Sequence, residues 1–148
     1  MAEFKIDPRL VASSEPLAAL KLSEARLQTD ARWTWIVLIP RRPGARELEH
    51  LTPADRALLL EEIVAAGSAV RAMGAALGRS VEKLNVGALG NRVEQLHVHV
   101  VGRRCDDPAW PDPVWGMEGA VAYAPASLAI AQAAALPAFE GMKRKPGG

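Results

Sequence analysis

Two histidines, His97 and His99, lie two residues apart inside an apolar run of the chain, Gln95-Leu96-His97-Val98-His99-Val100-Val101. Because a β-strand alternates its side chains between two faces, this spacing places both imidazoles and the Gln95 amide on one face and the apolar side chains on the other. An imidazole is largely neutral at pH 7, so one ring can act as a nucleophile while its neighbour binds an anion or donates a proton. Two such rings on a rigid strand suit phosphoryl chemistry.

The bulk composition is typical of one globular domain spanning residues 1–148. Hydrophobic residues make up 49% and charged residues 24% of the sequence, enough to build a core at this length. The net charge of +1 argues against bulk nucleic acid or an anionic membrane surface as a partner. Cys105 is the only cysteine, which excludes an internal disulfide and a cysteine-based zinc site. No apolar stretch reaches about 18 residues, so the sequence predicts a cytoplasmic protein.

Five segments have the composition or alternation of β-strands: residues 17–22, 25–29, 33–39, 81–88 and 95–103. The first two are expected to pair across Ser23-Glu24. The third is rich in aromatic and β-branched residues and ends at Pro40, which predicts a central strand buried on both faces. The last two predict a hairpin whose first strand carries Leu84, Val86 and Ala88 on its apolar face.

Helices are indicated by caps and by apolar spacing. Thr52 followed by Pro53 predicts the start of a long helix that ends near Gly78. Its apolar stripe repeats at intervals of three and four: Leu59, Ile63, Ala66, Val70, Met73 and Leu77. Asp7-Pro8 predicts a short helix ending near residue 14, residues 127–136 predict a closing helix, and residues 143–148 predict a frayed tail. This order predicts an α+β domain with a mainly antiparallel sheet.

The histidine strand resembles the motif of the histidine triad (HIT) family of nucleotide hydrolases and transferases. That motif reads His-φ-His-φ-His-φ-φ, where φ is apolar; here Gln95 stands at the first histidine, His97 at the middle one and His99 at the last. The similarity extends over about residues 30–104. It includes Asn85, Gly87 and Gly90 before the motif and Gly102-Arg103-Arg104 after it.

The resemblance implies a HIT-like fold: a mainly antiparallel five-stranded sheet with one long helix and a C-terminal helix, in a homodimer whose sheet continues across the two-fold axis. It also implies hydrolysis or nucleotidyl transfer at a phosphoanhydride or phosphoramidate bond of a purine nucleotide, such as a dinucleoside polyphosphate. His97 would attack the α-phosphate to form a nucleotidyl-histidine, and water would release a nucleoside monophosphate. His99 would stabilise the phosphate oxygens. No metal or other cofactor is required by this scheme.

The resemblance further implies substrate contacts for three residues. Asn85 matches the asparagine of the family's strand, Asn91 would contact phosphate together with backbone N–H groups near Gly90, and Asp30 would bond the ribose hydroxyls. Gln95 is the departure from the motif, because its amide can hydrogen-bond phosphate but cannot carry the charge of an imidazolium. We expect the nucleophile to survive and the rate or leaving-group preference to change.

Other interpretations of these residues are open. If Gln95 weakens catalysis, the chain is a nucleotide-binding or sensing protein. Alternatively, His97 and His99 with a carboxylate would bind a metal ion. Outside the motif, Trp110 and Trp115 are expected to be packing anchors in a proline-rich loop, and Arg103-Arg104 to be a solvated strand end.

Overall fold

The structure is a computed structural model that describes residues 3–146. Its centre is a five-stranded sheet in the order β1-β2-β3-β5-β4, and every neighbouring pair is antiparallel. The strands are β1 (Ser14–Ala19), β2 (Ser23–Gln28), β3 (Trp35–Pro40), β4 (Lys83–Gly87) and β5 (Val98–Arg103). The predicted α+β class and antiparallel sheet are confirmed.

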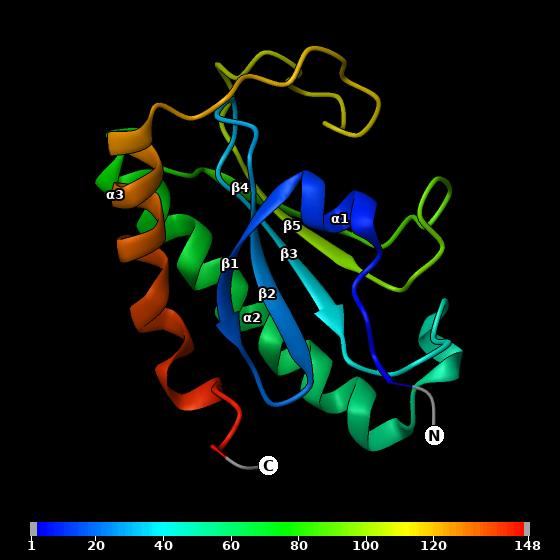
Figure 1. Cartoon of the computed structure of the whole chain (residues 1–148). Helices are drawn as coiled ribbons and strands as arrows, with labels where there is room; N and C mark the ends of the chain where they lie inside the picture. The colour runs from blue at the N-terminus through cyan, green and yellow to red at the C-terminus, as the bar shows by residue number, and fades with distance from the viewer. Residues whose placement is uncertain (1–2, 147–148) are drawn as a thin grey trace.

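The helices lie on both faces of the sheet (Figure 1). They are α1 (Pro8–Ala12), the 3-10 helix η1 (Leu48–His50), α2 (Pro53–Ala76), α3 (Pro125–Ala135) and the 3-10 helix η2 (Leu136–Met142). The long helix begins as its cap predicts, since the Thr52 hydroxyl accepts from Asp55 N at 3.1 Å. Within residues 3–146, no helix combines the length and the apolar character needed to cross a membrane.

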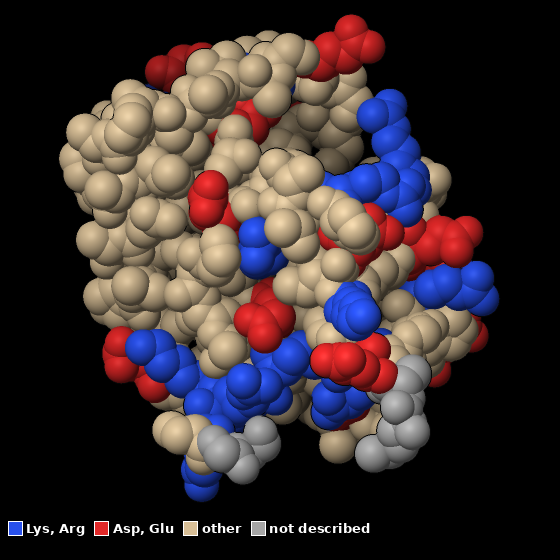
Figure 2. Space-filling view, in the orientation of Figure 1, with Lys and Arg blue, Asp and Glu red and all other residues tan. Residues whose placement is uncertain are grey.

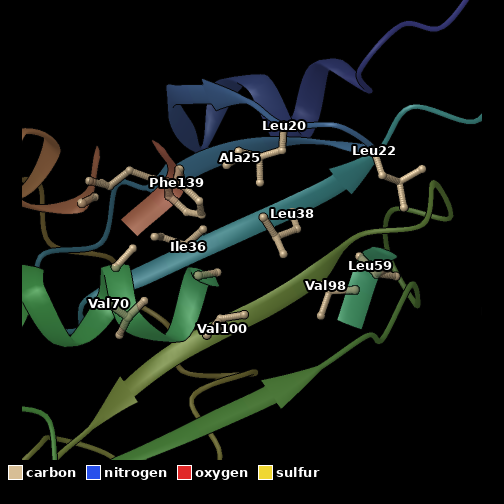
Figure 3. Packing of buried hydrophobic residues seen from close by; sticks show 14 of the residues in the cluster. Leu20, Leu22, Ala25, Ile36, Leu38, Leu59, Val70, Val98, Val100 and Phe139 are labelled. Carbon is tan, nitrogen blue, oxygen red and sulfur yellow. The ribbon is translucent and has the colours of Figure 1, made fainter. Parts of the chain in front are cut away.

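The main core lies between α2 and one face of the sheet (Figure 3). Ile36 and Leu38 of β3 and Val98 and Val100 of β5 point toward the helix, as the alternation of strand residues requires. The predicted stripe of α2 meets them, with four of its members fully buried: Leu59, Ala66, Val70 and Met73.

One charged residue, Glu62, lies within this core. Its Oε2 accepts from Leu22 N at 2.8 Å, while Oε1 has no partner among the residues that the structure describes. Burial raises the pKa of the Glu62 carboxyl. The side chain therefore ties α2 to the turn between β1 and β2 at an electrostatic cost.

A second, smaller core covers the opposite face of the sheet. Trp35, Val37 and Val101 pack there against Leu10 of α1 and Val114 of the loop that follows β5. All residues of β3 are buried, which confirms the central strand expected from its composition. The two histidines project into the part of this face that these segments leave open.

The first hairpin differs from its predicted boundaries. The turn between β1 and β2 lies at Leu20–Leu22, not at Ser23-Glu24. Leu20 and Leu22 are fully buried in the main core, and Leu20 N donates to Ser23 O at 2.8 Å to close the turn. The predicted strand end at residue 22 was therefore wrong, because the apolar residues 20 and 22 belong to the turn and pack into the core.

The histidine strand begins at Val98 rather than at Gln95. Leu96 N donates to Ala45 O at 3.0 Å, outside the β3–β5 ladder, so Gln95 and His97 lie in the approach to the strand. The preceding strand, β4, is an edge strand, and Val86 is 49% exposed although an apolar face was expected there.

The C-terminal segment is bonded to the first hairpin. Lys143 pairs with Leu20 in an isolated bridge, and Arg144 N donates to Ala19 O at 2.9 Å. These contacts hold the start of the segment that was expected to be a frayed tail; residues 147–148 lie outside the described residues.

Candidate active site

A cleft of about 820 Å³ lies on the face of the sheet opposite α2 and contains both motif histidines. Its floor is formed by Trp35, His97 and His99. Its walls come from α1, the segment after β2, the loop between β4 and β5, and residues 114–120. Figure 2 shows a hollow between α1 and the loop at the top of the view, with Lys and Arg side chains at its right-hand side.

His97 is held with one ring nitrogen free to attack. The residue is buried, with 6% of its surface exposed, and its Nδ1 lies 2.6 Å from the Gln95 carbonyl oxygen. A carbonyl can only accept, so Nδ1 carries the proton. In the neutral ring the lone pair is therefore on Nε2, which is the nitrogen available as a nucleophile.

His99 is held in the opposite tautomer. The Trp35 indole Nε1 donates to His99 Nδ1 at 3.0 Å. An indole N–H can only donate, so Nδ1 is the acceptor and Nε2 carries the proton. Burial and the neighbouring His97 lower the pKa of His99 to about 3. This ring is therefore a neutral hydrogen-bond donor throughout the physiological pH range.

The two rings and an indole form a compact aromatic group. The His97 and His99 ring centroids are 4.9 Å apart at 78°, and the Trp115 ring is 5.8 Å from His99. Gly87 allows this approach, because an added Cβ would lie 3.0 Å from Trp115 Cη2. Trp115 thus contributes to the cleft wall as well as to packing.

Asp30 and Asn91 both line the cleft. The Asp30 carboxylate accepts from Arg32 Nη2 at 2.8 Å and from Val121 N at 3.3 Å. Burial opposes ionisation of Asp30, but the bonds from Arg32 and Val121 outweigh it and lower the pKa of the carboxyl. Asn91 is exposed and follows Gly90. The φ of Gly90, 72°, lies in the left-handed region, which favours glycine.

Gln95 does not line the cleft with its side chain. Its Nε2 donates to Lys5 O and its Oε1 accepts from Asp7 N, both at 2.8 Å. Both the oxygen and the nitrogen of the amide are thus used to attach the N-terminal segment.

Asn85 is also directed away from the cleft. Its Oδ1 accepts from Arg103 Nη1 at 2.7 Å. Arg103 is 1% exposed and forms a two-pronged ion pair with Asp107, at 2.8 and 3.0 Å. The expectation of a solvated strand end was wrong for Arg103, because the loop after β5 folds back to place a carboxylate over it.

Comparison with known families gives a match to the HIT domain over residues 9–106. This chain belongs to the HIT family. Similar solved structures include a histidine triad protein from Sinorhizobium meliloti, with 40% identity over 90% of this chain and 96% of that one and a TM-score of 0.82. Another, from Marinobacter aquaeolei, has 36% identity over 95% and 99% of the two chains and a TM-score of 0.84. A histidine triad protein from Bradyrhizobium japonicum has 35% identity, 91% and 99% coverage and a TM-score of 0.80. Comparison with proteins of curated function gives no match.

In this HIT domain the structure adds residues that the motif does not contain. Trp35 orients His99, and Arg9 and Arg92 lie at the cleft beside Asn91. The sequence signal for Trp35 was its place in the buried central strand, because alternate side chains of a strand beside the histidine strand lie on the histidine face. Within residues 3–146, no group of three or more His, Cys, Asp or Glu side chains is arranged to hold a metal ion.

Proposed function

We propose that this HIT protein cleaves a phosphoanhydride or phosphoramidate bond at the α-phosphate of a purine nucleotide, with His97 as the nucleophile. HIT membership places the chain in a family of nucleotide hydrolases and transferases. The observation that carries the finer proposal is the opposite proton placement on two adjacent rings, with a free lone pair at His97 Nε2 and an N–H at His99 Nε2.

The reaction proceeds in two displacements. His97 Nε2 attacks the α-phosphorus, a P–N bond forms, and the bond to the leaving group breaks with its electron pair on the leaving group, which takes a proton from solvent. His99 Nε2–H donates to a non-bridging oxygen as charge develops there. Water then attacks the same phosphorus, the P–N bond breaks with its electron pair returning to His97 Nε2, the proton of the water passes to solvent, and a nucleoside monophosphate leaves.

The nucleoside is assigned to the end of the cleft that contains Asp30. That carboxylate is held ionised by Arg32 and lies at the cleft, where it accepts from a ribose hydroxyl. Asn91, together with backbone N–H groups near Gly90, is assigned to the phosphate. The scheme requires no metal ion, because His97 Nε2 supplies the lone pair and His99 Nε2–H supplies the hydrogen-bond donor.

The test is AMP release from diadenosine tetraphosphate and from adenosine 5′-phosphoramidate without added metal. His97→Ala is expected to abolish turnover, and radiolabelled nucleotide is expected to be trapped on wild-type protein but not on the variant. His50→Ala is the matched control, because His50 is exposed and lies outside the cleft. Tight nucleotide binding without turnover in wild-type protein would instead favour the sensing function.

We also propose a homodimer formed at the β4 edge of the sheet. Val86 of this edge strand is exposed, and α2, whose Gly67 lies against Leu84 of β4, presents Leu60 and Val64 at 59% and 60% exposure. Exposed apolar side chains beside an unpaired strand edge suit pairing with a second copy. Sedimentation equilibrium is expected to give the dimer mass for wild type and the monomer mass for a Leu60→Glu, Val64→Glu variant. A monomeric wild type would refute the proposal.

A further inference from the structure

Two arginines from distant parts of the sequence meet at one end of the cleft. Arg9 belongs to α1, and its Nη1 donates to Arg92 O, in the loop between β4 and β5, at 2.9 Å. Both residues line the cleft and both are exposed. The guanidinium groups are therefore accessible to a ligand that occupies the cleft.

This end lies across α1 from Asp30. Just after the last residue of α1, Ser13 O accepts from Thr29 N at 3.0 Å, and Thr29 directly precedes Asp30. At the other end of the same helix Arg9 meets Arg92. His97 is connected to this end, because Gln95 bonds His97 through its carbonyl and bonds Asp7, the partner of Arg9, through its side chain. The leaving group of a nucleotide with its ribose at Asp30 and its α-phosphate at His97 is therefore assigned to the two arginines.

The two arginines keep N–H groups that are free to bind an anion. Asp7 accepts from Arg9 Nε and Nη2 at 3.1 and 2.9 Å, so with the bond to Arg92 O two of the five guanidinium N–H groups of Arg9 remain free. The Arg92 side chain makes no ion pair within the described part of the chain. The nearby Glu94 is paired with Arg46 at 3.6 Å.

We propose that Arg9 and Arg92 bind the phosphate groups of the leaving group, so that the site prefers nucleotides in which further phosphates follow the scissile bond. Guanidinium groups bind phosphate through charge-assisted hydrogen bonds that an uncharged or amine leaving group cannot form. Gln95 is the positioning residue of this subsite, because its amide holds the backbone of Lys5 and Asp7 beside Arg9. The inference rests on the proposed function and adds the determinant of leaving-group preference.

The experiment compares kcat/KM for diadenosine tetraphosphate with kcat/KM for adenosine 5′-phosphoramidate. In Arg92→Ala and Arg9→Ala the value for the tetraphosphate is expected to fall about 10-fold or more, chiefly through KM, while the value for the phosphoramidate falls less than about 3-fold. Arg92→Lys is expected to restore part of the loss. Arg144→Ala is the control, because it removes an exposed arginine at the far end of β1, outside the cleft.

The outcomes separate the inference from the proposed function. If wild-type protein cleaves both substrates and the Arg9 and Arg92 variants lose the same factor on each, the leaving-group subsite is refuted and the proposed function stands. If wild-type protein cleaves neither, the proposed function fails. Calorimetry with diadenosine tetraphosphate and with AMP then decides the subsite, since equal loss of affinity for both ligands in Arg92→Ala overturns it.

Discussion

Because of the hydrogen bond from Trp35 to His99, we expect Trp35→Phe to lower kcat. Trp35→Phe keeps an aromatic ring on β3 but removes the donor that fixes His99 Nδ1 as an acceptor. The His99 proton is then free to occupy either ring nitrogen, and one of the two forms presents no N–H to the phosphate at Nε2.

The size of the effect follows from the hydrogen bond. A hydrogen bond between neutral groups contributes a net free energy of about 1 kcal/mol. This keeps about five of every six His99 rings in the Nε2–H form. Without it the two tautomers become comparable, and kcat falls about 2-fold from population alone. If the ring also loses its orientation, the transition state loses the whole hydrogen bond from His99, which contributes up to about 1.5 kcal/mol, and kcat then falls by at most roughly 10-fold.

The assay is kcat for AMP release, combined with ¹⁵N NMR of the histidine rings to read the tautomer. Trp33→Phe is the matched control, because Trp33 lies two residues away, packs edge-on to Trp35 at 6.3 Å, and its Nε1 has no hydrogen-bond partner within residues 3–146. An unchanged kcat in Trp35→Phe, with His99 still in the Nε2–H form, would refute the reasoning. An equal loss in Trp33→Phe would attribute the effect to packing.

Three further predictions concern the scaffold. Gln95→Ala should loosen the N-terminal segment by about 1 to 3 kcal/mol for two lost hydrogen bonds, seen as faster amide exchange and proteolysis before residue 10, and unchanged exchange there would contradict it. Asp107→Ala should cost roughly 3 to 5 kcal/mol in urea unfolding, because Arg103 is left as an unpaired buried charge; a loss below about 1 kcal/mol would show that water compensates it. Glu62 has a raised pKa in the folded state, so its contribution to stability is fully present below its unfolded pKa and is lost as pH rises through the folded pKa. Glu62→Gln should therefore be the more stable protein at pH 8, by on the order of 1 kcal/mol, with the advantage vanishing near pH 4, and parallel pH profiles for the two proteins would contradict this.

The sequence predicted the elements whose signals are local. The stripe of α2, its Thr52 cap and the buried β3 all depend on periodicity or on neighbours in the chain, and all three are found in the structure. The turn at Leu20–Leu22 could not be predicted from composition, because two of its residues are apolar and pack in the core, and none is a typical turn residue.

The contacts that complete the site are not local and could not be predicted in this way. Val37 pairs with His99 and Trp35 pairs with Val101, so the bond from Trp35 to His99 runs diagonally across two strands whose register no short pattern specifies. The hydrogen bond between Arg103 and Asn85 is also non-local, because the two residues belong to different strands. Only the fold decides whether such a residue faces solvent, a partner or the substrate.

The position of Gln95 separates the role of its backbone from the role of its side chain. The tautomer of His97 is set by the backbone carbonyl of residue 95, which every amino acid supplies, so the proposed role of His97 as nucleophile does not depend on the side chain at this position. The side chain is thereby free for another role, and its amide reaches two backbone groups about 90 residues away in the sequence. The consequence of having glutamine here is thus expected in how the N-terminal segment, and Arg9 with it, meets the substrate, rather than in whether His97 can attack.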